Sequence, residues 1–348
     1  MTVAGAKRSD HLLKVLSGYQ HVLVLTHDNP DPDAIASGWA VAALVRAKAA
    51  LPVRFVAGGA IFRAENRRMV ELLEPPLEFV EQIEVPEGTA TVLVDAEPHA
   101  VNHLLGEAGL PTAVIDHHQH EGRRPRLPFC DIRPKVVASA TIAAHYLREQ
   151  HIDPGPALAT ALTYAIRTDA TGLRGFSAAD HRAMRWLSLR ADHQKLTDIE
   201  NAPLQPDYYA DLLLAMQNTF LYEDVALCFL PRAGGSEIIA EVADLLIRHR
   251  DLTRVMVGGV VNGDLLVSVR SKVGAGDASD LVARSLEGLG HGGGHCQRAG
   301  GKVPGMARGE RVSEDLQSML RNRWLGVCGV DAQRGMRLVP KREILENL

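Results

Sequence analysis

The sequence predicts an α/β protein with two domains, the first of them built on a doubly wound parallel sheet. Short apolar runs rich in β-branched residues alternate with helix-forming segments through the first half of the chain, a pattern that is typical of parallel α/β sheets. Three of these runs lead directly into acidic or imidazole side chains. The chain has 348 residues, more than one hydrophobic core usually fills, so we expect a second domain.

The spacing of apolar residues predicts the elements of the first domain in order. Leucines recur at helical spacing within residues 10–17, and an apolar run at 22–26 predicts the first strand. Residues 34–50 are rich in alanine and other helix formers, which predicts a helix. The remaining predictions are strands over 53–56, 91–95 and 113–116, and helices over 63–73, 101–108, 139–150 and 157–168. This alternation indicates βαβ units.

The second half of the chain begins after a polar segment, residues 192–209, that contains two prolines and that we interpret as the interdomain connection. A helix is predicted beside it over 210–219. The pair Asn262-Gly263 predicts a hairpin turn. The other predictions are strands over 225–229, 254–261 and 265–270, and helices over 237–248 and 277–289. We therefore expect a first domain at 1–200, a linker with a connecting helix at 201–222, and a smaller mixed α/β domain at 223–348.

Composition and charge narrow the class of protein. Apolar residues make up 46% and charged residues 23% of the chain, as in ordinary soluble proteins. The formal net charge of -4 gives no basic surface for long duplex nucleic acid, so a small anionic substrate fits better. Four widely spaced cysteines indicate free thiols in a reducing compartment. We find no signal peptide and no continuous membrane-spanning stretch, and therefore expect a cytoplasmic protein with no membrane partner.

Carboxylate and imidazole side chains follow three of the predicted strands. They are His27, Asp31 and Asp33, then Asp95, and then Asp116, His117 and His118. Parallel strands present their carboxyl ends at one edge of the sheet, so these groups should converge there. So many like charges require a cation to hold them, and a mixed imidazole and carboxylate set favours manganese. The first loop by itself could also be an Asx-rich turn with a helix cap.

These motifs resemble the DHH phosphoesterases. The segment 27–34, Asp95, the triplet 116–118 and Asp169 match the four motifs of that family in order. A carboxyl-terminal element, Gly292-Gly293-Gly294-His295, resembles the DHHA1 domain, so that the resemblance spans about His21 to Val303. Within the family, residues 58–68 are similar to the nanoRNase and pAp-phosphatase (NrnA-like) branch.

The resemblance implies a site for two Mn²⁺ ions, with Mg²⁺ or Co²⁺ as substitutes. The implied ligands are His27 and Asp31 for one ion, Asp33, His117 and Asp169 for the other, and Asp95 as the bridge. Asp116 would orient an imidazole. His118 would face the phosphate and stabilise charge or protonate the leaving oxygen. Ser139 and Thr141 either lie near this site, as hydroxyl residues do in relatives, or cap a helix.

The glycine-rich run 290–295 is the predicted substrate-binding element. Backbone amides that are free of side chains approach a phosphate closely, although such a run is also typical of a flexible surface loop. Together with Arg270, it would form an anion clamp. The predicted contacts are Arg270, Gly292, Gly293, Gly294 and His295. We expect the substrate to lie in a cleft between the two domains.

The function that we expect is a manganese-dependent phosphoesterase that uses a two-metal hydroxide mechanism on short oligoribonucleotides (nanoRNA), linear dinucleotides or pAp. Cyclic-dinucleotide hydrolysis stays open. A family II inorganic pyrophosphatase shares the first motifs but has a different second domain, and RecJ-type action on long single strands is disfavoured by the acidic charge. A non-catalytic nucleotide-binding module is a further alternative. A homodimer is suggested by the resemblance alone.

Overall fold

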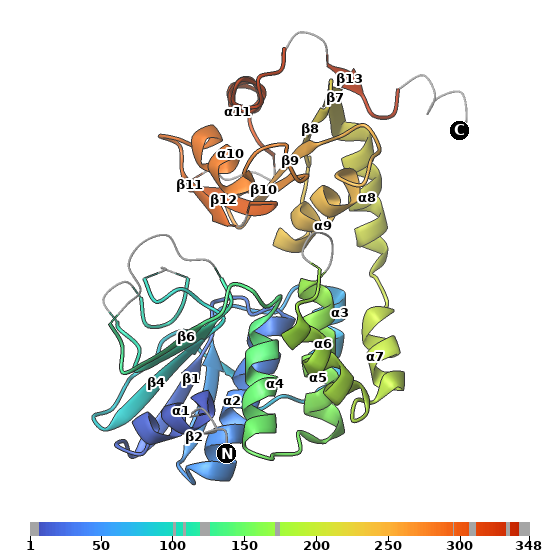
Figure 1. Cartoon of the computed structure of the whole chain (residues 1–348). Coiled ribbons are helices and arrows are strands. Elements are labelled where there is room, and N and C mark those ends of the chain that lie inside the picture. Colours follow the sequence, from blue (N-terminus) through green and yellow to red (C-terminus); the bar gives the residue numbers. More distant parts are fainter. Residues whose placement is uncertain are drawn as a thin grey trace. The chain divides into compact units, whose positions relative to one another are not determined.

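The computed structural model describes residues 7–99, 102–106, 109–118, 126–170, 175–294, 296–305, 311–331 and 335–340 (Figure 1). The chain divides into two compact units, Met1–Ala202 and Pro203–Leu348. This division lies within the polar segment that the sequence analysis interprets as a connection. Each unit has its own sheet, and we describe the two separately.

Unit 1 contains a six-stranded sheet in which every strand pair is parallel, which confirms the predicted fold class. The strands are β1 (His21–Leu25), β2 (Val53–Ala57), β3 (Leu77–Phe79), β4 (Thr89–Val94), β5 (Ala113–Asp116) and β6 (Phe129–Ile132). Their order is β3-β2-β1-β4-β5-β6. Because β1 pairs with both β2 and β4, the chain reverses its direction of winding beside β1, and ligands of open α/β sheets bind at such a switch point.

The helices of unit 1 share one large hydrophobic core with one face of this sheet. They are α1 (Arg8–Leu16), α2 (Pro32–Lys48), α3 (Ala64–Leu73), α4 (Ser139–Glu149), α5 (Gly155–Asp169), α6 (Ala178–Ser188) and α7 (His193–Glu200). The central helix α2 packs against α4 and α5 (Figure 1). Its Gly38 lies on the Phe55 ring, where a Cβ would come within 2.4 Å of a ring carbon. Only glycine lets α2 approach β2 this closely.

The opposite face of the sheet has a smaller core that irregular segments cover in the described part of the chain. Leu104 and Leu105 belong to this cover. The predicted helix over 101–108 is wrong for residues 102–106, which form a bend, a bridge and turns. Tertiary pairing outweighs helix propensity here, since the carbonyl of Asn102 accepts from the backbone N–H of Asp28, and His103 forms a β-bridge with His27.

Unit 2 contains a seven-stranded mixed sheet with helices, as predicted for the second domain. The strands are β7 (Thr219–Tyr222), β8 (Val225–Phe229), β9 (Arg254–Val261), β10 (Asp264–Ser271), β11 (His291–Gly294), β12 (Arg298–Val303) and β13 (Met336–Arg337). The helices are α8 (Pro206–Asn218), α9 (Ser236–Leu246), α10 (Ala278–Ser285) and α11 (Glu314–Cys328). The order is β11-β12-β10-β9-β8-β7-β13, and β8 and β9 are parallel.

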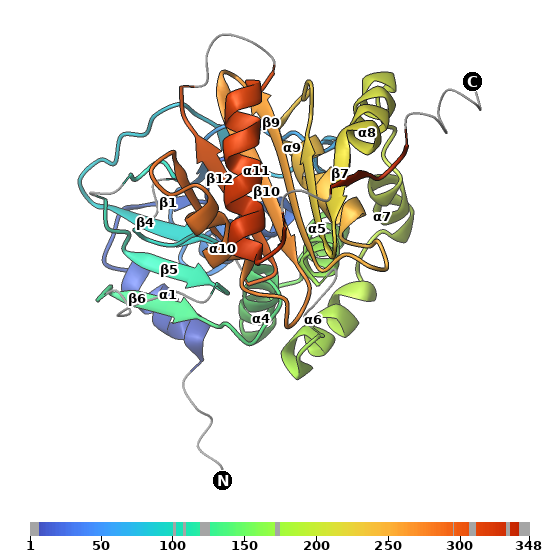
Figure 2. The ribbon, with the colours of Figure 1, turned by 90° about the horizontal axis from the view of Figure 1, so that it is seen from above.

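Two hydrophobic cores lie on the two faces of the second sheet, one under α10 and α11 and the other under α8 and α9 (Figure 2). The predicted hairpin between β9 and β10 is confirmed, with positive φ angles at both Asn262 and Gly263. The range expected as a linker contains α8 and β7, which belong to unit 2. Within the described residues, every helix is too short or too polar to cross a membrane.

Candidate metal centre

The loop between β1 and α2 supplies the first group of side chains. Asp31 is the N-cap of α2 and accepts a hydrogen bond from the backbone N–H of Ala34 at 3.0 Å, so the predicted helix cap is present. His27 Nδ1 lies 2.9 Å from the carbonyl oxygen of Asp28 and must donate its proton to it. In the neutral imidazole this tautomer has its lone pair on Nε2, which lies 4.0 Å from Asp31 Oδ1. A metal-binding histidine is commonly held in this way.

Asp95 follows β4 and lies between the two imidazoles of the site. It is 3% exposed and has a φ of 56°, a backbone conformation that few residues other than glycine adopt. Its Oδ2 lies 3.9 Å from His27 Nε2 and its Oδ1 lies 3.5 Å from His117 Nε2. Ser139 Oγ donates to Asp95 Oδ1 at 3.0 Å. The two carboxylate oxygens thus face different imidazoles, as a bridging ligand requires.

Asp33, His117 and Asp169 form a second group beside the first. His117 Nε2 lies 3.7 Å from Asp33 Oδ2 and 3.4 Å from Asp169 Oδ2. Asp33 is fully buried in the first turn of α2, and its two oxygens accept backbone N–H groups of Ser139 and Ala140, each at 2.7 Å. These amides begin α4, whose positive dipole end favours a carboxylate. The same contacts fix where Asp33 points.

The protonation states of this centre reflect burial and like charges. Burial, followed by the charges of Asp95 and Asp169, raises the pKa of Asp33 well above its usual value. Burial, followed by the charge of His118, lowers the pKa of His117 to about 4, so this imidazole is neutral at pH 7. A neutral imidazole and a carboxylate crowded by other carboxylates are both favourable ligands for a divalent cation.

His118 has the opposite character from His117, although the two are adjacent. Burial disfavours its charged form, but a hydrogen bond with Asp116 and the charge of Asp95 outweigh burial and raise the pKa of His118 to about 10. Its Nδ1 lies 2.7 Å from Asp116 Oδ1, which also accepts the backbone N–H of His117 at 2.7 Å. Asp116 therefore orients a positively charged His118, whose Nδ1 lies 3.7 Å from Asp95 Oδ1.

The structure brings all six predicted metal ligands together. Their ligand atoms lie within 4.8 Å of one another in two groups, which are His27, Asp31 and Asp95, and Asp33, His117 and Asp169. A third such group contains Asp95, His117 and His118. Four carboxylates with imidazole nitrogens are a donor set that suits Mn²⁺ and related ions. The residues present therefore fit two divalent cations with Asp95 between them, although their role as ligands stays a prediction.

The predicted substrate contacts lie in unit 2. Arg270 on β10 is 8% exposed, and its guanidinium donates to Asp244 Oδ1 at 2.6 Å and to Ser268 Oγ at 2.8 Å. It is thus committed to an internal ion pair with Asp244 on α9, a partner 26 residues away that no local sequence pattern indicates. Gly292, Gly293 and Gly294 form the edge strand β11, rather than a flexible loop. His295 lies outside the described residues.

Ser139 and His103 lie beside the predicted ligands, whereas Thr141 binds elsewhere. Ser139 lies at the site through its bond with Asp95, as one of its two predicted interpretations holds. Thr141, in contrast, donates to Asp180 at 2.7 Å. His103 is 3% exposed and forms a backbone bridge with His27, and neither of its ring nitrogens has a hydrogen-bond partner among the described residues. No local sequence signal places His103 beside His27.

A comparison with protein families finds a match over the part of the chain that contains most of the predicted metal ligands. Residues 21–166 match the model of the DHH family, N-terminal domain. That segment runs from β1 to α5 and contains five of the six predicted ligands; Asp169 lies just beyond it. Over 316 residues, 89% of the chain, the sequence is 28% identical to an uncharacterized protein of Methanocaldococcus jannaschii, and the chain spans 64% of the length of this curated relative.

Two solved structures are similar in fold. An exopolyphosphatase-related protein from Bacteroides fragilis has a TM-score of 0.70 at 14% identity, with coverage of 94% of this chain and 98% of that protein. RecJ from Thermus thermophilus, in complex with Mn²⁺, has a TM-score of 0.53 at 16% identity, and 94% of this chain matches 55% of RecJ. At these identities the likeness concerns the fold.

Proposed function

We propose that this protein is a divalent-metal-dependent phosphoesterase that hydrolyses short oligoribonucleotides, linear dinucleotides or pAp. The observation that carries the proposal is that two clusters of imidazole and carboxylate side chains lie side by side, with Asp95 between them. Except for Asp169 at the end of α5, they follow the carboxyl ends of neighbouring parallel strands, where α/β proteins bind ligands. The match of residues 21–166 to the DHH family model supports the same class of reaction.

In this proposal His27 and Asp31 would hold one cation, and Asp33, His117 and Asp169 would hold the other. Asp95, which lies between the two groups, would serve both. Such a pair of cations would supply an activated water and positive charge for the phosphoryl oxygens. Mn²⁺ suits this donor set, with Mg²⁺ or Co²⁺ as substitutes; the similarly folded RecJ structure was solved with Mn²⁺.

His118 supplies a positive charge and a proton at the edge of the metal centre. Asp116 holds its Nδ1, so that Nε2 is left to donate to a phosphoryl or leaving-group oxygen. An imidazolium in this position stabilises charge that develops in the transition state. Asp116 is accordingly a positioning residue, because it acts through His118.

We further propose that residues 1–200 carry catalysis and that the domain at 223–348 contributes to substrate binding. Backbone amides of Gly292, Gly293 and Gly294 and the side chain of His295 are the proposed contacts with a phosphate or sugar. Direct contact by Arg270 is not part of the proposal, since Asp244 already binds its guanidinium. The net charge of -4 favours short substrates over long duplex nucleic acid.

The function is tested on protein stripped with a chelator and reloaded with Mn²⁺, Mg²⁺ or Co²⁺. Each form is incubated with pAp, pGpG, pApA, cyclic dinucleotides, short oligoribonucleotides and pyrophosphate, and products are resolved by anion-exchange chromatography. We expect mononucleotide release from linear dinucleotides with Mn²⁺, and none after chelation. Cleavage of pyrophosphate alone would indicate a pyrophosphatase, and cleavage of cyclic substrates alone a cyclic-dinucleotide phosphodiesterase. Binding without turnover would indicate a non-catalytic module.

A further inference from the structure

A cavity of about 490 Å³ opens in unit 1 among the loops that follow β1, β2 and β3. The residues that line it are Asp28, Asn29, Gly58, Gly59, Phe79, Val80, Glu81 and Leu104. They follow β1, β2 and β3 at the same carboxyl edge of the sheet that carries the metal centre. Asp28 and Asn29 lie in the chain between His27 and Asp31, two of the predicted ligands. A cavity of this size lies in the range of small-molecule sites.

The floor of the cavity is built by a close contact between two loops. The backbone N–H of Asn29 donates to the carbonyl of Gly58 at 3.0 Å, and Asn29 Oδ1 accepts the backbone N–H of Ala60 at 3.0 Å. A Cβ on Gly58 would come within 2.1 Å of Asp28 Oδ1, and Gly59 has a φ of 74°. The positive φ requires glycine at Gly59, whereas the contact at Gly58 is with the end of the Asp28 side chain. Since its oxygen is already bonded, the Asn29 amide is left as a donor.

The polar groups of the cavity are mainly acceptors. Asp28 and Glu81 are carboxylates, and Asp28 Oδ1 is buried with no hydrogen-bond partner among the described residues. A buried acceptor without a donor is unfavourable, and a ligand hydroxyl or amino group would satisfy it once the carboxylate turns toward the cavity. Among the described residues that line the cavity, none is positively charged. The cavity therefore repels phosphate and suits a neutral group with donors.

The remaining lining is apolar and includes an aromatic ring. Phe79 is 42% exposed at the end of β3, with Val80 beside it and Leu104 from the irregular segment that covers the sheet. An exposed aromatic ring beside hydrogen-bond acceptors is suited to bind a nucleoside. The ring stacks on the base, and the carboxylates accept hydrogen bonds from amino groups of the base or hydroxyl groups of the ribose.

We propose that this cavity binds the nucleoside portion of the substrate, namely the base and ribose whose phosphate lies at the metal centre. This inference rests on the proposed phosphoesterase function and deepens it. Phe79 stacks on the base, and Asp28 and Glu81 accept hydrogen bonds from its donors. The consequence is selectivity for nucleotide esters over pyrophosphate and polyphosphate, which have no group for this cavity.

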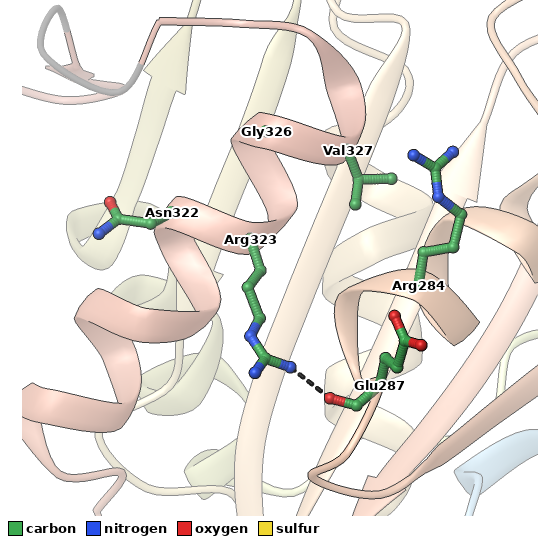
Figure 3. Close-up of a pocket in the computed structure, with 6 residues that line it drawn as sticks. All are labelled: Arg284, Glu287, Asn322, Arg323, Gly326 and Val327. Carbon is green, nitrogen blue, oxygen red and sulfur yellow. Dashed lines mark hydrogen bonds between the residues drawn. The ribbon is translucent and has the colours of Figure 1, made fainter.

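A second hollow, in unit 2, provides an instructive contrast (Figure 3). It has a volume of about 440 Å³ and is lined by Arg284, Glu287, Asn322, Arg323, Gly326 and Val327. Arg323 donates to the carbonyl oxygen of Glu287, and Arg284 pairs with Asp280 at 3.3 Å. Both guanidinium groups are already bound within unit 2, so this hollow carries no ligand proposal.

Binding of a nucleoside without its phosphate tests the cavity independently of catalysis. Saturation-transfer NMR is recorded with adenosine and the chelator-treated full chain, with Phe79→Ala as the test variant. Phe62→Ala is the matched control, since Phe62 is also exposed but does not line the cavity. We expect wild type and Phe62→Ala to bind adenosine, and Phe79→Ala to bind about tenfold more weakly. Equal binding by Phe79→Ala, or preferential binding of the polyamine spermidine, would overturn the proposal.

Kinetics with a linear dinucleotide separate this inference from the function on which it rests. For Phe79→Ala we expect KM to rise about tenfold with kcat unchanged, because stacking stabilises ground state and transition state alike. Phe62→Ala should hydrolyse the dinucleotide with the KM and kcat of wild type, since Phe62 does not line the cavity. If the protein binds adenosine but does not cleave the dinucleotide, the proposed phosphoesterase function is wrong and the proposed nucleoside site stands. If Phe79→Ala cleaves the dinucleotide with the KM of wild type, the proposed nucleoside site is wrong and the proposed phosphoesterase function stands.

Discussion

Asp33 and Asp131 are both buried aspartates of unit 1, and their surroundings are opposite. Asp131 on β6 binds the guanidinium of Arg133 through both of its oxygens, at 3.0 and 2.6 Å, and Tyr146 donates to it as well. Burial opposes its charge, but these hydrogen bonds outweigh burial and lower the pKa of Asp131. Asp33 is surrounded by the carboxylates of Asp95 and Asp169, which together with burial raise its pKa.

This difference in surroundings separates a buried carboxylate that stabilises the fold from one that is suited to bind a cation. A buried carboxylate that is paired with a cationic side chain fits the folded chain without a ligand. Carboxylates that crowd one another destabilise the chain unless a cation is bound, so a fold that retains them indicates a site. Arg270 with Asp244 in unit 2 repeats the paired arrangement of Asp131. The following predictions test the contrast, in order of decreasing effect.

The largest effect is expected at Asp95. Asparagine adopts the positive φ that Asp95 needs and still accepts from Ser139, so Asp95→Asn removes mainly the charge between the two groups. We expect kcat/KM with Mn²⁺ to fall by at least about 10³-fold. The free energy of unfolding in the presence of a chelator should change little, because Asp95 repels the carboxylate of Asp33 but attracts the charged His118. Initial rates and urea unfolding measure the two quantities; retained activity would contradict the bridging role.

Asp131→Asn should give the reverse outcome. Its unfolding free energy at pH 7 should fall by about 2–3 kcal/mol, because Arg133 loses its partner in a largely buried pair, while the response to Mn²⁺ stays that of wild type. The stabilisation by Asp131 is present above the unfolded-state pKa of about 3.9 and is lost as pH falls through the lowered native value. The difference from wild type in urea unfolding should therefore shrink below about pH 4; a difference that is constant with pH would contradict this account.

Ser139→Ala tests how Asp95 is held. Loss of the hydroxyl that donates to Asp95 Oδ1 should weaken Mn²⁺ binding about tenfold, as for other groups that orient metal ligands. Ser285→Ala is the control, since Ser285 is equally buried but donates to the carbonyl of Leu281. Competition titrations with a metal-sensitive dye measure both affinities. Equal affinities for the two variants would mean that Ser139 only begins α4.

The smallest effect is expected for an exposed ion pair. Arg54 and Glu78 approach to 2.6 Å, but their side chains are 59% and 51% exposed. Water and salt screen such a pair, so Arg54→Ala should lower the unfolding free energy by no more than about 0.5 kcal/mol. Urea unfolding at low and high salt measures it, and a loss as large as that of Asp131→Asn would show that distance, rather than burial, decides the strength of these pairs.

Much of the fold of unit 1 could be predicted because its signals are local. The strands β1, β2, β4 and β5 are predominantly apolar, and most of the predicted helices lie within two or three residues of their predicted bounds. The short strands β3 and β6 have no such run. The sequence does not predict α6, although its capping box, Ser177 with Asp180, is a signal that the sequence contains. The interpretation of 192–209 as a connection is wrong for α7, whose Leu196 and Ile199 belong to the core of unit 1.

The sequence by itself determined that the groups after β1, β4 and β5 meet at the metal centre, whereas Asp169, at the end of α5, was predicted only from the resemblance. Each of the three loops from His27, Asp95 and Asp116 follows its strand, and the carboxyl ends of parallel strands share one edge. Only the tertiary structure decided which charges are paired and which are not. Arg270 meets Asp244, and Asp28 meets Gly58, through segments that lie far apart in the chain. Strand formation depends on neighbours in sequence, whereas charge compensation and cavities depend on how distant elements pack.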